Sequence, residues 1–328
     1  MRVGLYFDLR NPDPWARPWT EVYRRALDLV VEAERLGASS AWFSEHHLFT
    51  DGYLPQPLTF AAAVAARTST IGIGTAVLIA ALRPAALVAE EVAVIDQISG
   101  GRLELGIGAG YSVPEYELYD TNITKRYGLT DAAVVEIRRL LDEGVVTPPA
   151  AQRPFPIWLG YQGPQGARRA GRLGVGLLSL DRALLEPYRT GLAEGGHDPS
   201  SARTGGMLDI IVADDPESAL ERILPHYAHQ LNSYRAAAVA GTGRDLPKEI
   251  TVDKLRSGAT QKGQIPGLRV LSPADAVRAI TEATEGSPVE HVYLWASVAG
   301  MPEDLVERHV ELVCTQLVPQ LQVDGRNT

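Results

Sequence analysis

The sequence predicts an α/β fold and, within that class, a (β/α)8 TIM barrel. Short runs of apolar and β-branched residues alternate with longer stretches in which apolar residues recur at helical spacing. Eight apolar runs can be counted along the 328 residues, and strands separated by helices pair in parallel with right-handed crossovers. An open, doubly wound sheet is the alternative arrangement of the same units. The length suits one large domain over residues 1–328.

Each strand is expected where a short apolar run lies between turn-forming residues. Val3–Phe7 is the first such run, and Ile71–Ile79 is β-branched and spaced by glycines. A proline-rich link over residues 148–156 leads into the apolar Ile157–Leu159. In chain order, the expected strands are residues 3–7, 41–43, 71–79, 103–107, 157–159, 175–180, 207–212 and 289–295.

Helices are expected between these strands, where apolar residues recur every three or four positions. Thr20 and Gly37 flank the first helix as N-cap and C-cap. Pro84 lies in the first turn of the third helix, and Gly100 ends it. The last helix carries Pro319 in its final turn. In chain order, the expected helices are residues 20–36, 57–67, 84–98, 131–141, 167–173, 216–238, a helix that starts near 273, and 302–321.

One segment after the seventh expected strand breaks the alternation. Residues 241–267 contain five glycines and scattered charges between two expected helices. Long irregular loops inside compact domains are usually functional lids or disordered segments. We therefore predict that residues 241–267 form an insertion that closes over the site as a lid.

Composition and charge exclude several classes of function. The chain has 31 Lys and Arg against 40 Asp and Glu, a net charge of −9, which disfavours binding to the phosphate backbone of nucleic acids. The apolar stretch of residues 71–82 is too short for a membrane span, which needs about 20 residues, and the first residues do not form a secretion signal. A single cysteine, Cys314, excludes an internal disulfide and a cysteine-based zinc site and is expected to be a packed residue. These observations predict a cytoplasmic location.

Glu45, His46 and His47 directly follow the second expected strand. In a TIM barrel the active site forms at the carboxyl ends of the strands. Adjacent strand residues face opposite sides, so at most one imidazole enters the barrel unless the backbone has already turned. A histidine here could donate a hydrogen bond or relay a proton; the alternative is that it caps the strand end and packs under the next loop. A metal site is disfavoured because the usual ligand spacings are absent, and His226 and His229 are interpreted as part of an exposed helix face.

Glycines follow two further strands. Gly160, Gly163 and Gly166 precede an arginine-containing helix, so backbone amides at its N-terminus could bind a phosphate. Residues 106–110 also carry glycines but do not match the dinucleotide-binding pattern. For both groups the alternative is that glycine permits tight packing. The missing fingerprint indicates that this chain has no Rossmann domain with which to reduce its own cofactor.

Several of these segments together resemble the bacterial luciferase-like flavin-dependent monooxygenases. The resemblance implies a TIM-like barrel that binds reduced FMN from a separate flavin reductase and oxidises a small organic substrate with O2 by flavin hydroperoxide chemistry. It also implies a homodimer, which we expect to form through residues 57–67 and 84–98. The resemblance is strongest in residues 38–112, and the segments that carry it are residues 41–47, 57–67, 73–76, 83–84, 95–108 and 300–303.

The resemblance also assigns roles to individual residues. His46 matches the family's catalytic histidine, and His47 and Glu45 beside it are expected to take part in catalysis. The Ala76–Val77 bond is expected to be a cis peptide under the flavin ring. No metal ligand is expected, and the cofactor-binding residues are expected to be Ala76, Val77, Tyr111, Arg126, Tyr161, Gln162, Gly163 and Gly166.

Departures from the luciferase subunit leave the cofactor open. Ala109 stands where luciferase has an arginine, and Gly163 and Gly166 replace hydroxyl residues, so Arg126 and backbone amides would have to hold the phosphate. Residues 108–116 also resemble the branch that uses a deazaflavin and transfers hydride without oxygen. The Glu-His-His tripeptide favours the FMN branch. A barrel that binds flavin without catalysis is the third alternative.

Overall fold

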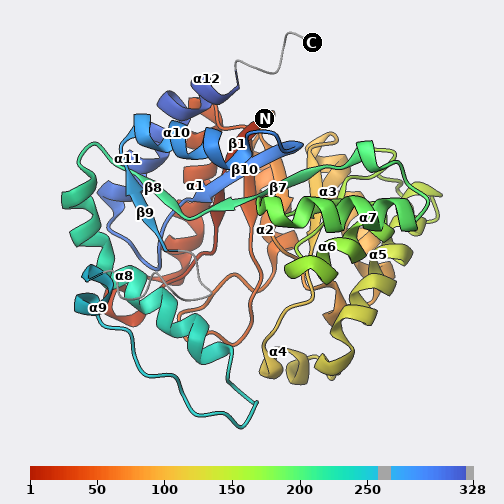
Figure 1. Ribbon diagram of the computed structural model, residues 1–328, viewed down its shortest axis with the longest axis horizontal. Coiled ribbons are helices and arrows are strands. Elements are labelled where there is room, and N and C mark those ends of the chain that lie inside the picture. The colour runs from red at the N-terminus through yellow and green to blue at the C-terminus, as the bar shows by residue number, and fades with distance from the viewer. Residues whose placement is uncertain (258–266, 323–328) are drawn as a thin grey trace.

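The computed structural model describes residues 1–257 and 267–322 and shows a closed, parallel barrel (Figure 1). The order of strands around the barrel is β1-β10-β7-β6-β5-β4-β3-β2, and neighbouring strands pair in parallel. This closure confirms the predicted (β/α)8 barrel and excludes the open sheet. The barrel strands are β1 (Arg2–Phe7), β2 (Ser40–Phe43), β3 (Gly72–Thr75), β4 (Leu103–Ile107), β5 (Ile157–Leu159), β6 (Gly176–Leu178), β7 (Thr204–Leu208) and β10 (Val289–Trp295).

Helices follow the strands and pack around the outside of the barrel (Figure 1). Those between barrel strands or closing the chain are α1 (Trp19–Leu36), α2 (Pro57–Arg67), α3 (Ala85–Ser99), α4 (Val113–Leu118), α5 (Arg126–Asp142), α6 (Gly163–Arg172), α7 (Leu185–Glu194), α10 (Pro273–Thr284), α11 (Glu303–Leu312) and α12 (Val318–Leu321). None of the helices in the described part of the chain has the length and apolar character needed to cross a membrane.

Alternation along the strands separates two apolar cores. Leu5 and Phe7 of β1 pack outward in a large cluster that includes helix residues such as Val30. Tyr6 belongs to a second, aromatic cluster with Trp42 of β2 and Tyr293 of β10, so the barrel interior is filled by rings. Cys314 is buried, which confirms that it is a packed residue.

A buried ionic group lies at the amino-terminal end of the barrel interior. Glu104 of β4 accepts hydrogen bonds from Trp158 Nε1 at 2.7 Å and His291 Nε2 at 3.0 Å, and Arg2 Nη1 lies 2.6 Å away. Burial acts to raise the pKa of Glu104, but His291, Arg2 and Trp158 together lower it from 4.5 to about 2. The barrel is therefore closed at this end by a carboxylate whose charge is well compensated.

The main correction concerns the seventh strand. Residues 207–212 are not one strand: β7 ends at Leu208, and β8 (Ile210–Val212) leaves the barrel and pairs with β9 (Arg269–Leu271). The glycine-containing start of β7 has little strand character in sequence, although it pairs with β6 and β10. The apolar run of residues 207–212 also does not show which strand each of its residues pairs with. The insertion between β8 and β9 holds α8 (Pro216–Ala237) and α9 (Val252–Arg256). Residues 258–266 of the predicted lid lie outside the described residues.

Several boundaries also differ from the prediction. Pro18, not Thr20, caps α1, and β3 ends at Thr75 instead of continuing to residue 79. α5 starts five residues early, at Arg126, and α4 and α7 are absent from the predicted elements because they are short and weakly periodic. The last helix is divided by a π-helical segment at residues 313–317, so Pro319 lies in the first turn of α12, where its missing N–H costs least.

The Glu104 group makes stability depend on acid pH. A carboxyl whose pKa is lowered by folding stabilises the fold above its unfolded pKa, near 4.5, and this contribution is lost as the pH falls toward 2. We expect Glu104→Gln to lower the free energy of unfolding at pH 7 by up to about 3 kcal/mol, with the difference from the parent shrinking below pH 4.5. Urea titrations at pH 7, 4 and 3 measure this; a difference that stays constant with pH would contradict the assignment. Glu90→Gln, at an exposed position of α3, is the control.

Candidate active site

His46 lies at the carboxyl end of β2 and is held by a fully buried carboxylate. Its Nδ1 is 2.7 Å from Oε1 of Glu115, on α4. The same oxygen accepts a hydrogen bond from the backbone N–H of His47 at 2.9 Å. Because Oε1 acts as an acceptor, Nδ1 of His46 carries the proton. Nε2 has no hydrogen-bond partner among the described residues and is left free to accept one.

Glu45 and His47 form a separate buried group. Nε2 of His47 lies 2.7 Å from Oε1 of Glu45, which also accepts from Arg83 at 2.7 Å. The other oxygen of Glu45 accepts from the backbone N–H of Ile79 at 2.8 Å. The two imidazoles thus diverge, as the alternation of strand side chains predicts. Glu45 and His47 fix the backbone at the strand end, whereas His46 is the partly exposed histidine.

Four aromatic rings surround the imidazole of His46. The sequence indicated Tyr111, whose ring lies 5.2 Å from His46. The hydroxyls of Tyr53 and Tyr234 are 2.7 Å apart. The three rings that sequence reasoning missed are Phe49 at 4.7 Å, Tyr53 at 4.7 Å and Tyr234 at 6.1 Å from His46.

The Ala76–Val77 bond is cis, which confirms the expectation from the resemblance. Both residues are half-buried. A Cβ atom on Gly108 would lie 2.3 Å from Val77 Cγ2, and one on Gly160 would lie 2.7 Å from Val77 Cγ1. These glycines, at the ends of β4 and β5, therefore leave room for Val77, as the packing alternative proposed.

The segment after β5 divides into packed and open positions. Tyr161 is buried, donates a hydrogen bond to Asp131 at 2.8 Å, and leaves no room for a Cβ on Gly166. Gln162 is exposed and caps α6, and Gly163 has a φ of 73° with nothing within 4 Å of its Cβ position. Gly163 alone combines a conformation that requires glycine with open space at a helix N-terminus.

Arg126 is the first residue of α5. Its guanidinium packs 4.6 Å from the ring of Tyr127, which in turn contacts the ring of Tyr161 at 5.4 Å. Nη1 donates to the carbonyl of Ile123 at 3.3 Å, but the buried Nε has no hydrogen-bond partner among the described residues. The rings of Tyr127 and Tyr161 thus link the first turn of α5, where Arg126 has an unused donor, to the segment that leads into Gly163 and α6.

α8 packs onto the loops that follow β1 and β2, which corrects the prediction for two histidines. His226 is buried, packs against Trp15 at 3.8 Å and contacts the carbonyl of Ala299 at 3.1 Å. His229 lies 2.9 Å from Asp51. Neither belongs to an exposed face, because this helix covers the barrel end instead of facing solvent. Asp51 and His229 are 178 positions apart, and Trp15 and His226 are still farther apart, so no local pattern could have indicated these contacts.

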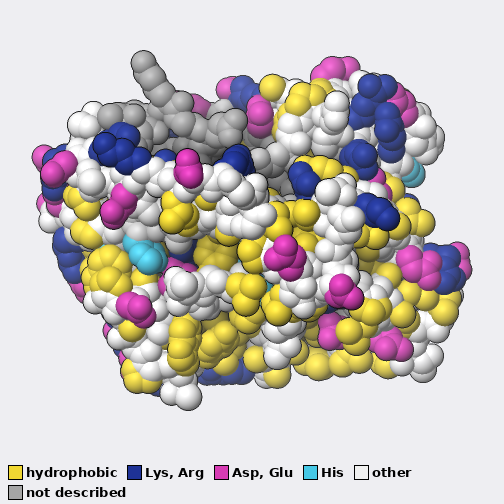
Figure 2. All heavy atoms as spheres, turned by 90° about the horizontal axis from the view of Figure 1, so that it is seen from below, with side chains coloured by type: hydrophobic (Ala, Val, Ile, Leu, Met, Phe, Trp, Pro, Cys, Tyr) yellow, Lys and Arg dark blue, Asp and Glu magenta, His cyan; other side chains and the backbone are white. Residues whose placement is uncertain are grey.

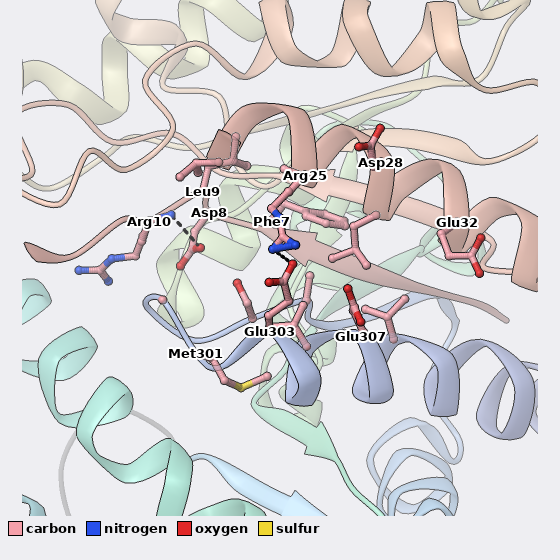
Figure 3. Close-up of a pocket in the computed structure, with 18 of the residues that line it drawn as sticks. Phe7, Asp8, Leu9, Arg10, Arg25, Asp28, Glu32, Met301, Glu303 and Glu307 are labelled. Atoms are coloured by element: carbon pink, nitrogen blue, oxygen red, sulfur yellow. Dashed lines mark hydrogen bonds and ion pairs between the residues drawn. The ribbon is translucent and has the colours of Figure 1, made fainter. Parts of the chain in front are cut away.

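A cavity of about 720 Å³ lies outside the barrel, between α1 and α11 (Figure 3). Arg25 of α1 and Glu303 of α11 form an ion pair in it. The buried Asp8 lines its end; burial raises the pKa of Asp8 to about 7 despite the opposing charge of Arg10. His46 is not among the lining residues, whereas Asp8 and Arg10 are.

Two negative observations bear on the chemistry. On the face shown in Figure 2, Lys and Arg side chains are scattered among Asp and Glu rather than joined in one basic patch. Within residues 1–257 and 267–322, no group of three or more His, Cys, Asp or Glu side chains is placed to hold a metal ion.

Comparison with known protein families decides the assignment. The family described as luciferase-like monooxygenase matches residues 1–291. The chain belongs to this family. It is 30% identical over 224 residues to F420-dependent glucose-6-phosphate dehydrogenase of Kineococcus radiotolerans, covering 60% of this chain and 66% of that protein. It is 27% identical to 4-hydroxyprotoasukamycin monooxygenase of Streptomyces nodosus subsp. asukaensis, covering 95% and 90%.

Comparison with a solved structure supports the fold. Monooxygenase RslO1 from Streptomyces bottropensis superimposes with a TM-score of 0.78 at 23% identity, over 98% of this chain and 99% of that chain. In several relatives the matched region is shorter and spans 49% to 68% of their length. The luciferase-like family includes both monooxygenases and F420-dependent enzymes, so membership alone does not decide the cofactor.

The contact between Glu115 and His46 predicts the tautomer of the imidazole. We expect neutral His46 to carry its proton on Nδ1 and to change to the Nε2–H form in Glu115→Leu, because the acceptor for Nδ1–H is then lost. NMR of the protein labelled with 15N-histidine distinguishes the two forms. Glu117→Leu, which changes an exposed position on the same helix, is the control and should leave the tautomer unchanged. An Nε2–H tautomer in the parent would contradict the assignment.

The space that Gly108 leaves for Val77 can be tested separately. Gly108→Ala places a methyl group within 2.3 Å of a Val77 methyl, so we expect a loss of about 1–3 kcal/mol in the free energy of unfolding. Gly128→Ala, in α5 with nothing near its Cβ position, should be neutral or stabilising. Denaturant titrations measure both. Equal stabilities for the two variants would show that Val77 does not fill this space.

Proposed function

We propose that the chain is a flavin-dependent monooxygenase that uses reduced FMN and O2 to oxidise a small organic substrate. The observation that carries the proposal is His46 at the barrel end, with Nδ1–H bound to Glu115 and Nε2 free to accept a proton. The similarity to a monooxygenase over 95% of the chain supports the same reaction class. The relative's own substrate is not transferred to this chain.

The residues present fit a flavin mononucleotide. Ala76 and Val77 present a half-buried surface that would lie against the flavin ring, and Tyr111, whose ring contacts that of His46, would contact the same group. The unused Nε of Arg126 and the amides at the start of α6, at Gly163, are donors suited to a phosphate. Gln162 would contact the same group, whereas Tyr161 and Gly166 would support it by packing. When bound, reduced FMN would supply the electrons that activate O2.

The chain's own residues divide the remaining work. His46 holds or accepts a proton at Nε2, while Glu115 keeps Nδ1 protonated and the ring in place. Glu45 and His47 are positioning residues, because their polar atoms are engaged with each other, Arg83 and the backbone. The aromatic rings around His46 exclude water from the reacting groups.

The proposal extends to partners and to the insertion. A separate flavin reductase would supply reduced FMN, because the sequence shows no dinucleotide-binding pattern. A homodimer would form through α2 and α3, and exposed Leu87, Val94 and Ile98 on α3 support this. The insertion after β7, with residues 241–267, would close over bound flavin.

A second candidate is hydride transfer with a deazaflavin. The 30% identity to an F420-dependent dehydrogenase favours it, as does Ala109 in place of the luciferase arginine. This enzyme would react without O2. A flavin-binding barrel without catalysis is the third candidate. It would have no turnover, so substitution of His46 could not reduce one.

Binding and reaction with O2 separate these candidates. We expect the parent to bind reduced FMN anaerobically, and Arg126→Met to bind it about tenfold more weakly because a phosphate contact is lost. His46→Ala should keep the affinity but change the rate at which bound flavin is reoxidised after O2 is added. Fluorescence titration and stopped-flow absorbance measure the two effects. Arg138→Met, farther along α5, is the control.

Binding of reduced F420 in place of reduced FMN, with no reaction with O2, would replace the proposal by the deazaflavin candidate. If the parent binds FMN and His46→Ala reoxidises bound flavin at the parent rate, the non-catalytic barrel would be favoured.

A further inference from the structure

Arg10, which follows β1, is buried behind the rings that surround His46. Its side chain is 0% exposed. The guanidinium carbon lies 5.7 Å from the ring centroid of Phe49, 5.3 Å from that of Tyr53 and 5.2 Å from that of Tyr234. In Figure 3 the Arg10 side chain points away from the cavity between α1 and α11. Arg10 is among the residues that line that cavity, but its guanidinium turns toward the rings at the barrel end.

The polar contacts of Arg10 hold three elements together. Nε and Nη2 contact Asp51, in the loop after β2, at 2.7 and 2.6 Å. Nη2 also donates to Ser233 of α8. Nη1 is buried without a hydrogen-bond partner among the described residues. An unpaired donor of a buried cation is costly, and here the faces of the aromatic rings provide the compensating negative potential.

The three rings that contact Arg10 also contact the imidazole of His46. Their centroids lie 4.7, 4.7 and 6.1 Å from that of the imidazole. Tyr234 comes from α8, in the insertion after β7, whereas Phe49 and Tyr53 come from the loop after β2. Only a planar, charged group with several donors can bind Asp51 with two nitrogens and face three rings at once. Lysine or a neutral side chain of similar length lacks one of these properties.

We propose that Arg10 is a positioning residue for His46. It holds the rings in the arrangement that fixes the imidazole, and it ties the insertion after β7 to that arrangement through Ser233 and Tyr234. The inference rests on the role proposed for His46 in the monooxygenase reaction. Arg10 itself does not contact His46, and its effect passes through the rings.

The test follows the imidazole directly, in the full chain without flavin. The His46 Cε1–H signal, identified by its absence in His46→Gln, is recorded by 1H–13C NMR in Arg10→Met, Arg10→Lys and the control Arg25→Met. Ring currents from the surrounding aromatics set this signal. We expect both Arg10 variants to move it toward the position of an exposed histidine and Arg25→Met to leave it unchanged. Tyr234→Leu, which removes one ring from the surface of α8, should move it in the same direction and decides the matter if Arg10→Met does not fold.

A kinetic readout completes the test. In the Arg10 variants that fold, we expect the affinity for reduced FMN to stay at the parent value. The factor by which His46→Ala changes the rate of flavin reoxidation should be about tenfold or more smaller in these variants than in the parent, as for a misplaced reacting group. A His46 signal that is unchanged in folded Arg10→Lys and Tyr234→Leu would overturn the inference. The NMR measurement needs no flavin, so failure to bind FMN would contradict the proposed function and leave the positioning role standing.

Discussion

The geometry of the site depends on one oxygen atom, Oε1 of Glu115. It accepts a hydrogen bond from the ring of His46 and another from the backbone of His47, so a single carboxylate fixes both the side chain and the strand end that carries it. Glu115 is fully buried on α4, a helix of six residues between β4 and α5. Both partners of Oε1 are donors at short range, whereas the other carboxylate oxygen, Oε2, is buried without a hydrogen-bond partner among the described residues. Glu115 reaches His46 only because the barrel brings the carboxyl ends of β2 and β4 close together.

Buried charges lie at both ends of the barrel, with aromatic rings between them. At the amino-terminal end, Glu104 is compensated by Arg2 and His291, and this group closes the interior. At the carboxyl end, Asp51 is compensated by Arg10, and Glu45 by Arg83. Removing one partner of a buried ion pair costs far more than the pair contributes. The two groups at the carboxyl end therefore act as rigid supports, and the chemistry is left to a histidine whose second nitrogen is unpaired among the described residues.

The sequence indicated the barrel and the central histidine, but only part of the site. Strand and helix periods are local, so the eight units can be counted from the order of the residues alone. The carboxyl-end rule then placed Glu45, His46 and His47. The departure of β8 from the barrel could not be predicted, because the composition of an apolar run does not show which strand it pairs with. Tyr234 and Arg10 could not be linked to His46 either, since the contacts join segments more than 200 positions apart in the chain. Gly166 and Tyr161 were indicated as flavin contacts, and packing explains both equally well.

The exit of β8 from the barrel has a consequence for how this chain can diversify. Because β8 and β9 pair only with each other in the described part of the chain, the insertion enters and leaves the fold through its own two-stranded sheet. Trp295 of β10 anchors the exit point by donating to Asp209 at 2.7 Å. The sequence and length of the insertion can therefore vary without changing the register of any barrel strand, provided that α8 keeps its contacts with Arg10 and Asp51. New side chains would then reach the site through α8, so selection on substrate choice and selection on foldability act on different parts of the chain.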